Sequence, residues 1–357
     1  MTAVLKTNGP SGRGDASRLR FNEALVAADF AAERYALNGA AATFADLLAY
    51  TRGTAMRYLH PVTRALADLA VNVPCLYTPD GRKALNLSGV NGAIFGSAPT
   101  GPGTSGTTYA AGNDNNVVPL ICYGGDGAQV SVSGDCAAVD DRGLIARPYR
   151  PALIRLTGGS RSLNFTFGAG VICYKLGSLP WAEWLGTNMT NAVATPVADL
   201  TPGAVAAVNS RDKLEIVGRY IPHEHRAFYS QTHNLLNLVD ANGNYIRLRL
   251  AADTCTWELA VAQTVATSGQ PAFSRVIPIL KPRSDYQTAL QLDFRILWDK
   301  IARRLSLWVN GRLTVVDMTM PEMGALTAAN LGRQGTSLPR CSIAHLAIYA
   351  GKPARVE

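Results

Sequence analysis

The sequence predicts a mainly β protein in three parts: an N-terminal arm with short helices, a middle β region and a C-terminal two-layer β-sandwich. Near the C-terminus, apolar and polar residues alternate strictly, as in half-buried strands. Short apolar runs bounded by Gly, Asp and Pro recur upstream. Charged residues are only 17%, beside 33 Gly and 19 Pro, which suits a turn-rich β protein. We place the three parts at residues 1–48, 49–187 and 188–357, a length that allows each part its own core.

The N-terminal part divides into a polar arm and an Ala-rich segment. Residues 1–16 contain the Gly-rich stretch from Asn8 to Asp15, which predicts an arm without regular structure. Residues 17–48 are rich in Ala and carry spaced apolar side chains. Because Ala favours helices, we predict one or two short helices here, separated near Asn38-Gly39.

The middle region begins with a long polar excursion and continues as a series of short strands. Gly and Thr dominate residues 97–106, and a loop of this length is typical of an interface or a functional rim. Beyond it, apolar runs predict the strands of a compact β domain at Val117–Tyr123, Gln129–Val132, Ala152–Leu156, Leu163–Phe167 and Val171–Leu176.

The C-terminal part follows a second break at Asn188–Thr201, where two Thr-Pro pairs interrupt the chain. Apolar alternation then predicts strands at Leu214–Tyr220, Tyr245–Leu250 and Trp257–Val261. With the hairpin described next, these strands are enough to complete a sandwich.

The clearest pattern lies between Asp285 and Tyr349. Leu, Phe, Ile and Trp occupy every second position from Leu290 to Trp298, and alternation resumes from Leu305 to Val309. Asn310-Gly311 then favours a tight hairpin, because this dipeptide tolerates positive φ. The order of strand, turn, Val-Asn-Gly and return strand resembles the concanavalin A-like and laminin-G-like jelly rolls, and implies a concanavalin A-like sandwich. An ordinary antiparallel hairpin explains the same pattern equally well.

A second resemblance covers Tyr50 to Arg82. Three short elements follow one another in order: an aromatic-Thr-Arg element at Tyr50–Arg52, an Asn-x-Pro element at Asn72–Pro74 and an Asp-Gly-Arg turn at Asp80–Arg82. This resembles a segment of virion proteins of tailed bacteriophages, where it commonly precedes a concanavalin A-like domain. The sequence departs from that segment at Cys75, where a basic residue is typical, and at Leu85–Leu87, which replaces an acidic strand end.

The resemblance implies a structural component of a phage tail, baseplate or fibre, located in the virion and assembled in the host cytoplasm. Its partners would be copies of itself, other virion proteins and host surface polysaccharide. A capsid decoration or head-spike protein is the alternative within this class. A carbohydrate-active hydrolase is the alternative from another class.

Charge and hydropathy exclude two further kinds of partner. The formal net charge is +8, but the basic residues are scattered and no run of five occurs, so we expect no nucleic-acid surface. No stretch of eighteen apolar residues occurs and the N-terminus lacks a leader pattern, so we expect neither membrane insertion nor classical export. The six cysteines are widely spaced and predict free thiols, although a Cys122–Cys136 bridge stays open.

No motif supports catalysis, so we predict a protein that is not an enzyme, with no catalytic residue and no cofactor. His223-Glu224-His225, with His233 nearby, suits Zn²⁺, but an exposed turn explains it better. Acidic residues offer many carboxylate pairs for glycoside hydrolysis and none stands out: Asp140, Asp141, Glu183, Glu215, Glu224, Glu258, Asp293 and Asp299. Loop carboxylates leave Ca²⁺ binding open at Asp114, Asp126, Asp140 and Asp141.

Five tryptophans are available for stacking on sugars: Trp181, Trp184, Trp257, Trp298 and Trp308. Trp298 is in phase with the apolar face of its strand and is predicted to lie in the core. Trp308 is out of phase with Leu307 and Val309, which predicts that it points outward. Trp308 is therefore the candidate contact for a glycan or a neighbouring chain.

Overall fold

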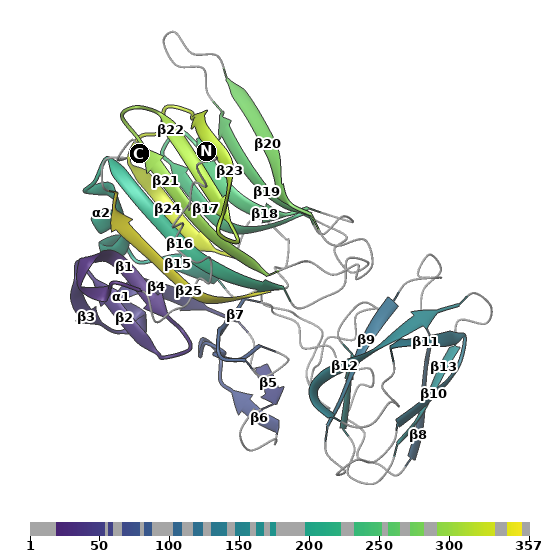
Figure 1. The fold of residues 1–357 in the computed structure, drawn as a ribbon. Coiled ribbons are helices and arrows are strands. Elements are labelled where there is room, and N and C mark those ends of the chain that lie inside the picture. Colours follow the sequence, from purple (N-terminus) through teal and green to yellow (C-terminus); the bar gives the residue numbers. More distant parts are fainter. Residues whose placement is uncertain are drawn as a thin grey trace, which may run out of the picture.

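The fold is a two-layer antiparallel β-sandwich, described here from a computed structural model (Figure 1). The structure describes residues 19–53, 56–59, 66–78, 82–87, 103–108, 117–123, 130–140, 147–157, 162–167, 172–175, 197–222, 232–251, 256–264, 272–281, 291–332 and 341–351. Within these ranges the regular structure is almost entirely β. The predicted mainly β class with a jelly-roll-like sandwich is thus confirmed.

One layer, sheet A, has nine strands. Its order is β23-β22-β21-β16-β25-β1-β2-β3, and β7 also pairs with β25. The bounds are β1 Ala24–Asp29, β2 Arg34–Leu37, β3 Ala40–Ala42, β7 Leu85–Asn86, β16 Lys213–Pro222, β21 Leu292–Asp299, β22 Arg304–Val309, β23 Arg312–Thr319 and β25 Cys341–Ala350.

The opposing layer, sheet B, has seven strands in the order β20-β19-β18-β17-β24-β15-β4. The bounds are β4 Leu48–Thr51, β15 Val197–Leu200, β17 His233–Asp240, β18 Tyr245–Leu250, β19 Trp257–Gln263, β20 Phe273–Leu280 and β24 Leu326–Leu331. The strands predicted at Leu214–Tyr220, Tyr245–Leu250 and Trp257–Val261 are therefore present as β16, β18 and β19.

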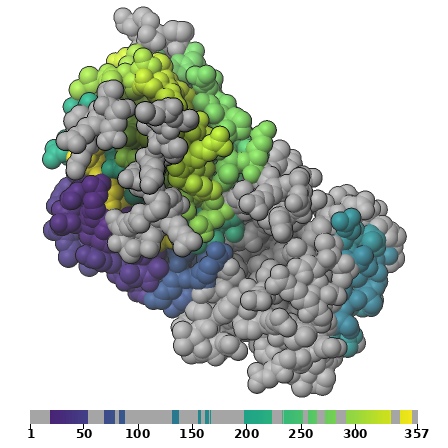
Figure 2. All heavy atoms as spheres, viewed as in Figure 1, coloured from purple at the N-terminus to yellow at the C-terminus, as the bar shows by residue number. Residues whose placement is uncertain are grey.

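The prediction of short helices within residues 17–48 is wrong for most of the segment. Strands β1, β2 and β3 fill it, and the helices are only the 3₁₀ turn η2 (Phe21–Glu23) and α1 (Phe44–Leu47). β1 pairs with β25 along its length, so the earliest described strand lies beside the last one. Figure 2 shows the same arrangement, with purple N-terminal residues on the body formed by the C-terminal strands. Tertiary pairing has overridden the helical preference of alanine.

Small side chains explain why β1 is rich in alanine. Ala24 and Ala27 are buried on the outer side of sheet A, where they pack with Phe21 and Tyr349. Larger residues at these positions would hold Phe21 away from the sheet. The alanines therefore serve close packing, which the sequence alone did not distinguish from helix formation.

Helices α1 and α2 (Pro202–Asn209) adjoin the sandwich at its β1, β15 and β24 side. Thr43 and Asp46 form a capping box at the start of α1. Thr201 caps α2 through a hydrogen bond from Ala204 N–H (3.2 Å), and Pro202 occupies the first turn. The Thr201-Pro202 pair that predicted a break is thus the start of a helix. The three-part division of the chain stays a prediction.

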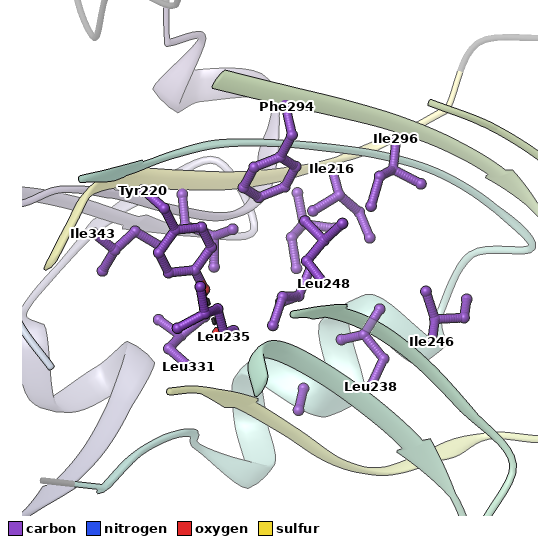
Figure 3. Close-up of a cluster of buried hydrophobic side chains, with 14 of the residues drawn as sticks. Ile216, Tyr220, Leu235, Leu238, Ile246, Leu248, Phe294, Ile296, Leu331 and Ile343 are labelled. Carbon is purple, nitrogen blue, oxygen red and sulfur yellow. Dashed lines mark hydrogen bonds between the residues drawn. The ribbon is translucent and has the colours of Figure 1, made fainter. Parts of the chain in front are cut away.

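The core lies between the two sheets and is filled by alternating apolar side chains from both (Figure 3). Tyr220 and Phe294 stack with centroids 5.9 Å apart, and the Tyr220 hydroxyl donates to the Leu235 carbonyl of the opposing sheet. Gly218 lies beneath this pair: an added Cβ would stand 2.7 Å from Phe294 Cζ, so only glycine fits. Trp298 is 2% exposed, which confirms its predicted core position.

The C-terminal hairpin forms as predicted. β21, β22 and β23 are consecutive neighbours in sheet A, and every second residue of β21 is buried. Asn310 and Gly311 have φ values of 49° and 79°, so both residues of the turn are left-handed. This is the conformation for which Asn-Gly is preferred.

The middle region is an insertion between two neighbouring strands. β4 and β15 are adjacent in sheet B and Thr51 pairs with Val197, so residues 52–196 are inserted at one point, and β7 of this segment pairs back into sheet A. The insertion contains the hairpin β5 (Met56–Leu59) and β6 (Leu66–Leu69), and two smaller sheets. Their strands are β8 Gly103–Thr108, β9 Val117–Tyr123, β10 Val130–Gly134, β11 Cys136–Asp140, β12 Arg147–Leu156, β13 Ser162–Phe167 and β14 Ile172–Lys175, which include all five predicted here. No helix in the described ranges combines the length and apolar character of a membrane span.

Candidate functional site

The outer face of sheet A carries Trp308, the residue that the sequence selected. Its neighbours Leu307 and Val309 are buried in the core, so Trp308 points outward as predicted. The Arg295 guanidinium lies over its ring, 4.9 Å from the centroid. Trp308 is half-buried rather than freely exposed, and its role as a contact stays a prediction.

The arginines around Trp308 are paired with carboxylates. Arg295 Nε donates to Glu215 (2.6 Å), and Arg20 contacts the other oxygen of Glu215 (3.0 Å). Arg219 and Asp293 form a second pair, with two contacts between guanidinium and carboxylate. The charges on this face are thus largely neutralised by one another, which leaves little unpaired charge for a ligand.

The outer face of sheet B carries a different arrangement, which we name the polar row. The residues come from four neighbouring strands, β15, β24, β17 and β18, and they stand opposite one another in register. They are Asp199, Asn330, Asn237 and Arg247. Their strand neighbours point into the core, so the polar row lies on the side of sheet B away from sheet A.

Arg247 forms the β18 end of the polar row. Its Nε donates to Asn237 Oδ1 (2.6 Å), and its guanidinium lies 3.5 Å from the centroid of the Tyr245 ring. Partial burial lowers the pKa of Arg247, and Tyr245 opposes that shift, but a guanidinium stays charged at neutral pH. No carboxylate among the described residues pairs with it, whereas Arg249 two positions on pairs with Glu258 (2.7 Å).

The polar row also contains an unpaired acceptor. Asn330 Oδ1 accepts no hydrogen bond and is enclosed by protein, although Asn237 and Asp199 flank it on the neighbouring strands. On β19, Ala260 stands opposite Arg247 and Ala262 opposite Tyr245, and both alanines are buried. The face therefore combines a cation, amides and an aromatic ring, the groups that recognise polar organic ligands.

The candidate catalytic and metal-binding residues do not assemble into a site in the described ranges. Glu215 and Glu258 lie on the outer faces of opposite sheets, each engaged by arginine. Asp299 is paired with Lys213 (2.8 Å). Burial raises the pKa of Asp299, but the Lys213 pair and backbone N–H donors outweigh burial, so the pKa lies below its usual value. The described residues contain no group of three His, Cys, Asp or Glu side chains able to hold a metal.

Several candidates fall outside the described residues. These are the histidine cluster at His223-Glu224-His225, Trp181, Glu183 and Trp184, and three of the four Ca²⁺ candidates, Asp114, Asp126 and Asp141. Asp140 ends β11.

Cys75, Cys136 and Cys341 are free thiols, so the Cys122–Cys136 bridge considered from the sequence does not form.

No family model and no curated protein matches the chain. Solved structures with a similar fold include the carbohydrate-binding module CBM40 of a Ruminococcus gnavus sialidase bound to sialyllactose (17% identity, 43% of this chain and 84% of that one, TM-score 0.32). A leech trans-sialidase is also similar (10% identity, 43% of this chain and 23% of that one, TM-score 0.31). Domain 4 of a Geobacillus stearothermophilus arabinanase is similar as well (15% identity, 44% of this chain and 68% of that one, TM-score 0.31). The chain thus spans 23% of the leech enzyme. These scores are too low to assign a ligand to this chain.

Sequence reasoning missed the polar row. Arg247 is one of the scattered basic residues in the sequence, and Asn237 and Asn330 belong to no motif. The available signal is the strand alternation, which places Arg247 and Arg249 on the outer face. The cross-strand register that assembles the row is not written in any local motif.

Proposed function

We propose that this chain is a non-catalytic adhesion protein that binds a saccharide on the outer face of sheet B. The observation that carries the proposal is Arg247, a charged side chain at the β18 end of the polar row with no carboxylate among the described residues to pair with it. On the outer face of sheet A, by contrast, both Arg219 and Arg295 are paired with carboxylates.

Saccharide chemistry suits the groups of this face. A sugar presents hydroxyls that both donate and accept, and an apolar ring face that stacks on aromatic side chains. Arg247 offers donors and Tyr245 offers a ring. Since both side chains stand on β18 within a rigid sheet, they are held in place before a ligand arrives, which lowers the entropic cost of binding.

A binding role is favoured over hydrolysis by the state of the carboxylates. Glycoside hydrolysis requires two carboxyl groups facing one scissile bond. Glu215 and Glu258 belong to opposite faces of the sandwich, and each forms an ion pair with arginine. A reducing-sugar assay on the bound polysaccharide tests this part of the proposal, since turnover would contradict it.

Binding should depend on Arg247. On a microarray of bacterial surface polysaccharides, we expect the full chain to bind and Arg247→Ala to lose at least about tenfold in affinity, roughly 1.4 kcal/mol. Arg295→Ala is the matched control, because Arg295 also lies over an aromatic ring but on the other face. Thermal melting of both variants confirms that they fold.

The same experiment tests Trp308. If Trp308→Ala abolishes binding while Arg247→Ala leaves it unchanged, the saccharide site lies on sheet A and our assignment to sheet B is wrong. If neither variant changes the affinity, the site lies on neither of these two faces.

The resemblance of residues 50–82 to phage virion proteins supports a place on a tailed-phage particle, in the tail, baseplate or fibre, or as a head decoration. There the sandwich would contact neighbouring copies, other virion proteins or host polysaccharide. We expect mass spectrometry of purified particles to detect the chain in stoichiometric amounts. Recovery from the lysate alone, and never from particles, would contradict the virion assignment without touching the saccharide proposal.

A further inference from the structure

A buried arginine marks the point where the chain leaves the sandwich. Arg52 follows β4 directly, and its side chain is only 2% exposed. Its backbone exchanges two hydrogen bonds with Asn72: Arg52 N–H donates to Asn72 Oδ1 (2.9 Å), and Asn72 N–H donates to the Arg52 carbonyl (3.1 Å). Asn72 has φ 63°, a left-handed conformation that Asn tolerates. The backbone of Arg52 is therefore fixed on both sides.

Most donors of this guanidinium have no acceptor. Nη2 donates to the Ala70 carbonyl (2.9 Å), with a longer contact to the Leu69 carbonyl (3.5 Å). Nε and Nη1 are enclosed by protein and make no hydrogen bond, and the same holds for the hydroxyl of Tyr50. Nε and Nη1 carry three of the five N–H groups of a guanidinium. Buried donors are rarely left unpaired, so several at one place require an explanation.

The positive charge of Arg52 also lacks a partner. Within the described residues Arg52 forms no ion pair, and the groups that act electrostatically on it are Tyr50 and Cys75. Burial raises the pKa of Tyr50 to about 12 and that of Cys75 to about 11, so both are neutral near pH 7. A guanidinium in this position is thus a buried cation without a counter-charge, which is strongly unfavourable.

We propose that Arg52 and Tyr50 bind a small inorganic anion, of the size of chloride, at the junction between the sandwich and the inserted region. An anion satisfies the free N–H and O–H donors and balances the charge. A water molecule satisfies donors but leaves the charge uncompensated. Because the donor atoms are enclosed, the surrounding side chains must shift to admit even a small ion, and a bulky organic anion is excluded. The site is separate from the polar row and independent of the saccharide proposal.

The test is the thermal stability of the full chain in two salts. The protein is dialysed into sodium gluconate, and gluconate is then replaced by chloride at constant ionic strength. A ligand that binds the folded state raises Tm in a saturable way. We expect a rise of roughly 3 °C, with a plateau, because a large protein gains a few degrees from moderate binding energy.

Variants separate specific binding from a general salt effect. Arg52→Met removes the charge and should abolish the chloride response, while Tyr50→Phe removes one donor and should shift the midpoint severalfold to higher chloride. Arg219→Gln, which breaks a surface ion pair, should keep the full response. If Arg52→Met does not fold, Tyr50→Phe decides, since its hydroxyl has no protein partner to lose.

Any one of three results would overturn the proposal. The first is an equal Tm in chloride and gluconate, and the second is a Tyr50→Phe midpoint equal to that of the unmodified chain. The third is an equal chloride response in Arg52→Met, which would leave water alone at these donors. Crystals grown in bromide provide a direct measurement: we expect an anomalous peak within hydrogen-bond reach of Arg52, and its absence would equally reject the site.

Discussion

Replacing Asp240 with Ala should lower the free energy of unfolding by at least about 3 kcal/mol, because four charge-assisted hydrogen bonds are lost and the two donors of Asn244 stay buried. Asp240 ends β17 and is 2% exposed. Its Oδ1 accepts from the N–H groups of Asn242 and Asn244 (both 2.9 Å). Its Oδ2 accepts from Asn244 Nδ2 (3.1 Å) and Gly324 N–H (3.0 Å). Urea unfolding followed by tryptophan fluorescence measures the change.

The side chain of Asn244, which is hydrogen-bonded to Asp240, connects three segments of the chain. Asn244 is fully buried, donates from Nδ2 to the Glu322 carbonyl (2.9 Å) and accepts from Thr264 N–H (2.9 Å). The turn after β17, the end of β19 and the loop before β24 are therefore held by one carboxylate and one amide. Loss of Asp240 should loosen all three segments together.

Isosteric changes supply the control. Asp240→Asn keeps the shape but places an NH₂ group among N–H donors, so it should destabilise nearly as much as Ala. Asp317→Asn replaces a 65% exposed carboxylate at a left-handed position that Asn tolerates, and should change stability by less than about 0.5 kcal/mol. Equal effects of the two Asn variants would show that the Asp240 hydrogen bonds contribute nothing specific.

The contrast between the C-terminal hairpin and the first strands shows what the sequence could predict. The hairpin of β21 to β23 depends on alternation within each strand and on Asn310-Gly311, both of which are local. The pairing of β1 with β25 joins residues more than 300 positions apart, so no window of sequence contains it. In β1 the local helical preference of alanine pointed the other way, and the long-range pairing determined the outcome.

The candidate sites follow the same rule. Trp308 was found because its orientation follows from the phase of one strand. The polar row needs the register of four strands, and the Arg52 site needs Asn72 to return to the end of β4. The sequence did mark Tyr50–Arg52 and Asn72–Pro74 as one ordered motif. It could not show that the backbones of Arg52 and Asn72 are hydrogen-bonded to each other.

Replacing Leu85 with Ala should destabilise the sandwich by about 2–5 kcal/mol, the range for deleting a buried leucine side chain. Leu85 belongs to the insertion, yet it is fully buried in the core between the sheets. β7 pairs with β25 through Leu85 opposite Ile343 and Asn86 opposite Ser342. Part of the insertion is therefore built into the sandwich, and a sandwich without it would expose this part of the core.

Hydrogen exchange gives a second measurement at the same place. Asn86 N–H donates to the Cys75 carbonyl (2.8 Å) and Leu87 N–H to the Cys341 carbonyl (3.1 Å), so both amides should be protected in the unmodified chain and exchange faster in Leu85→Ala. Val71→Ala is the matched control, because Val71 is 48% exposed and its loss should cost less than about 0.5 kcal/mol. If Leu85→Ala costs no more than Val71→Ala, and the two amides keep their protection, β7 is not an anchor of the inserted region.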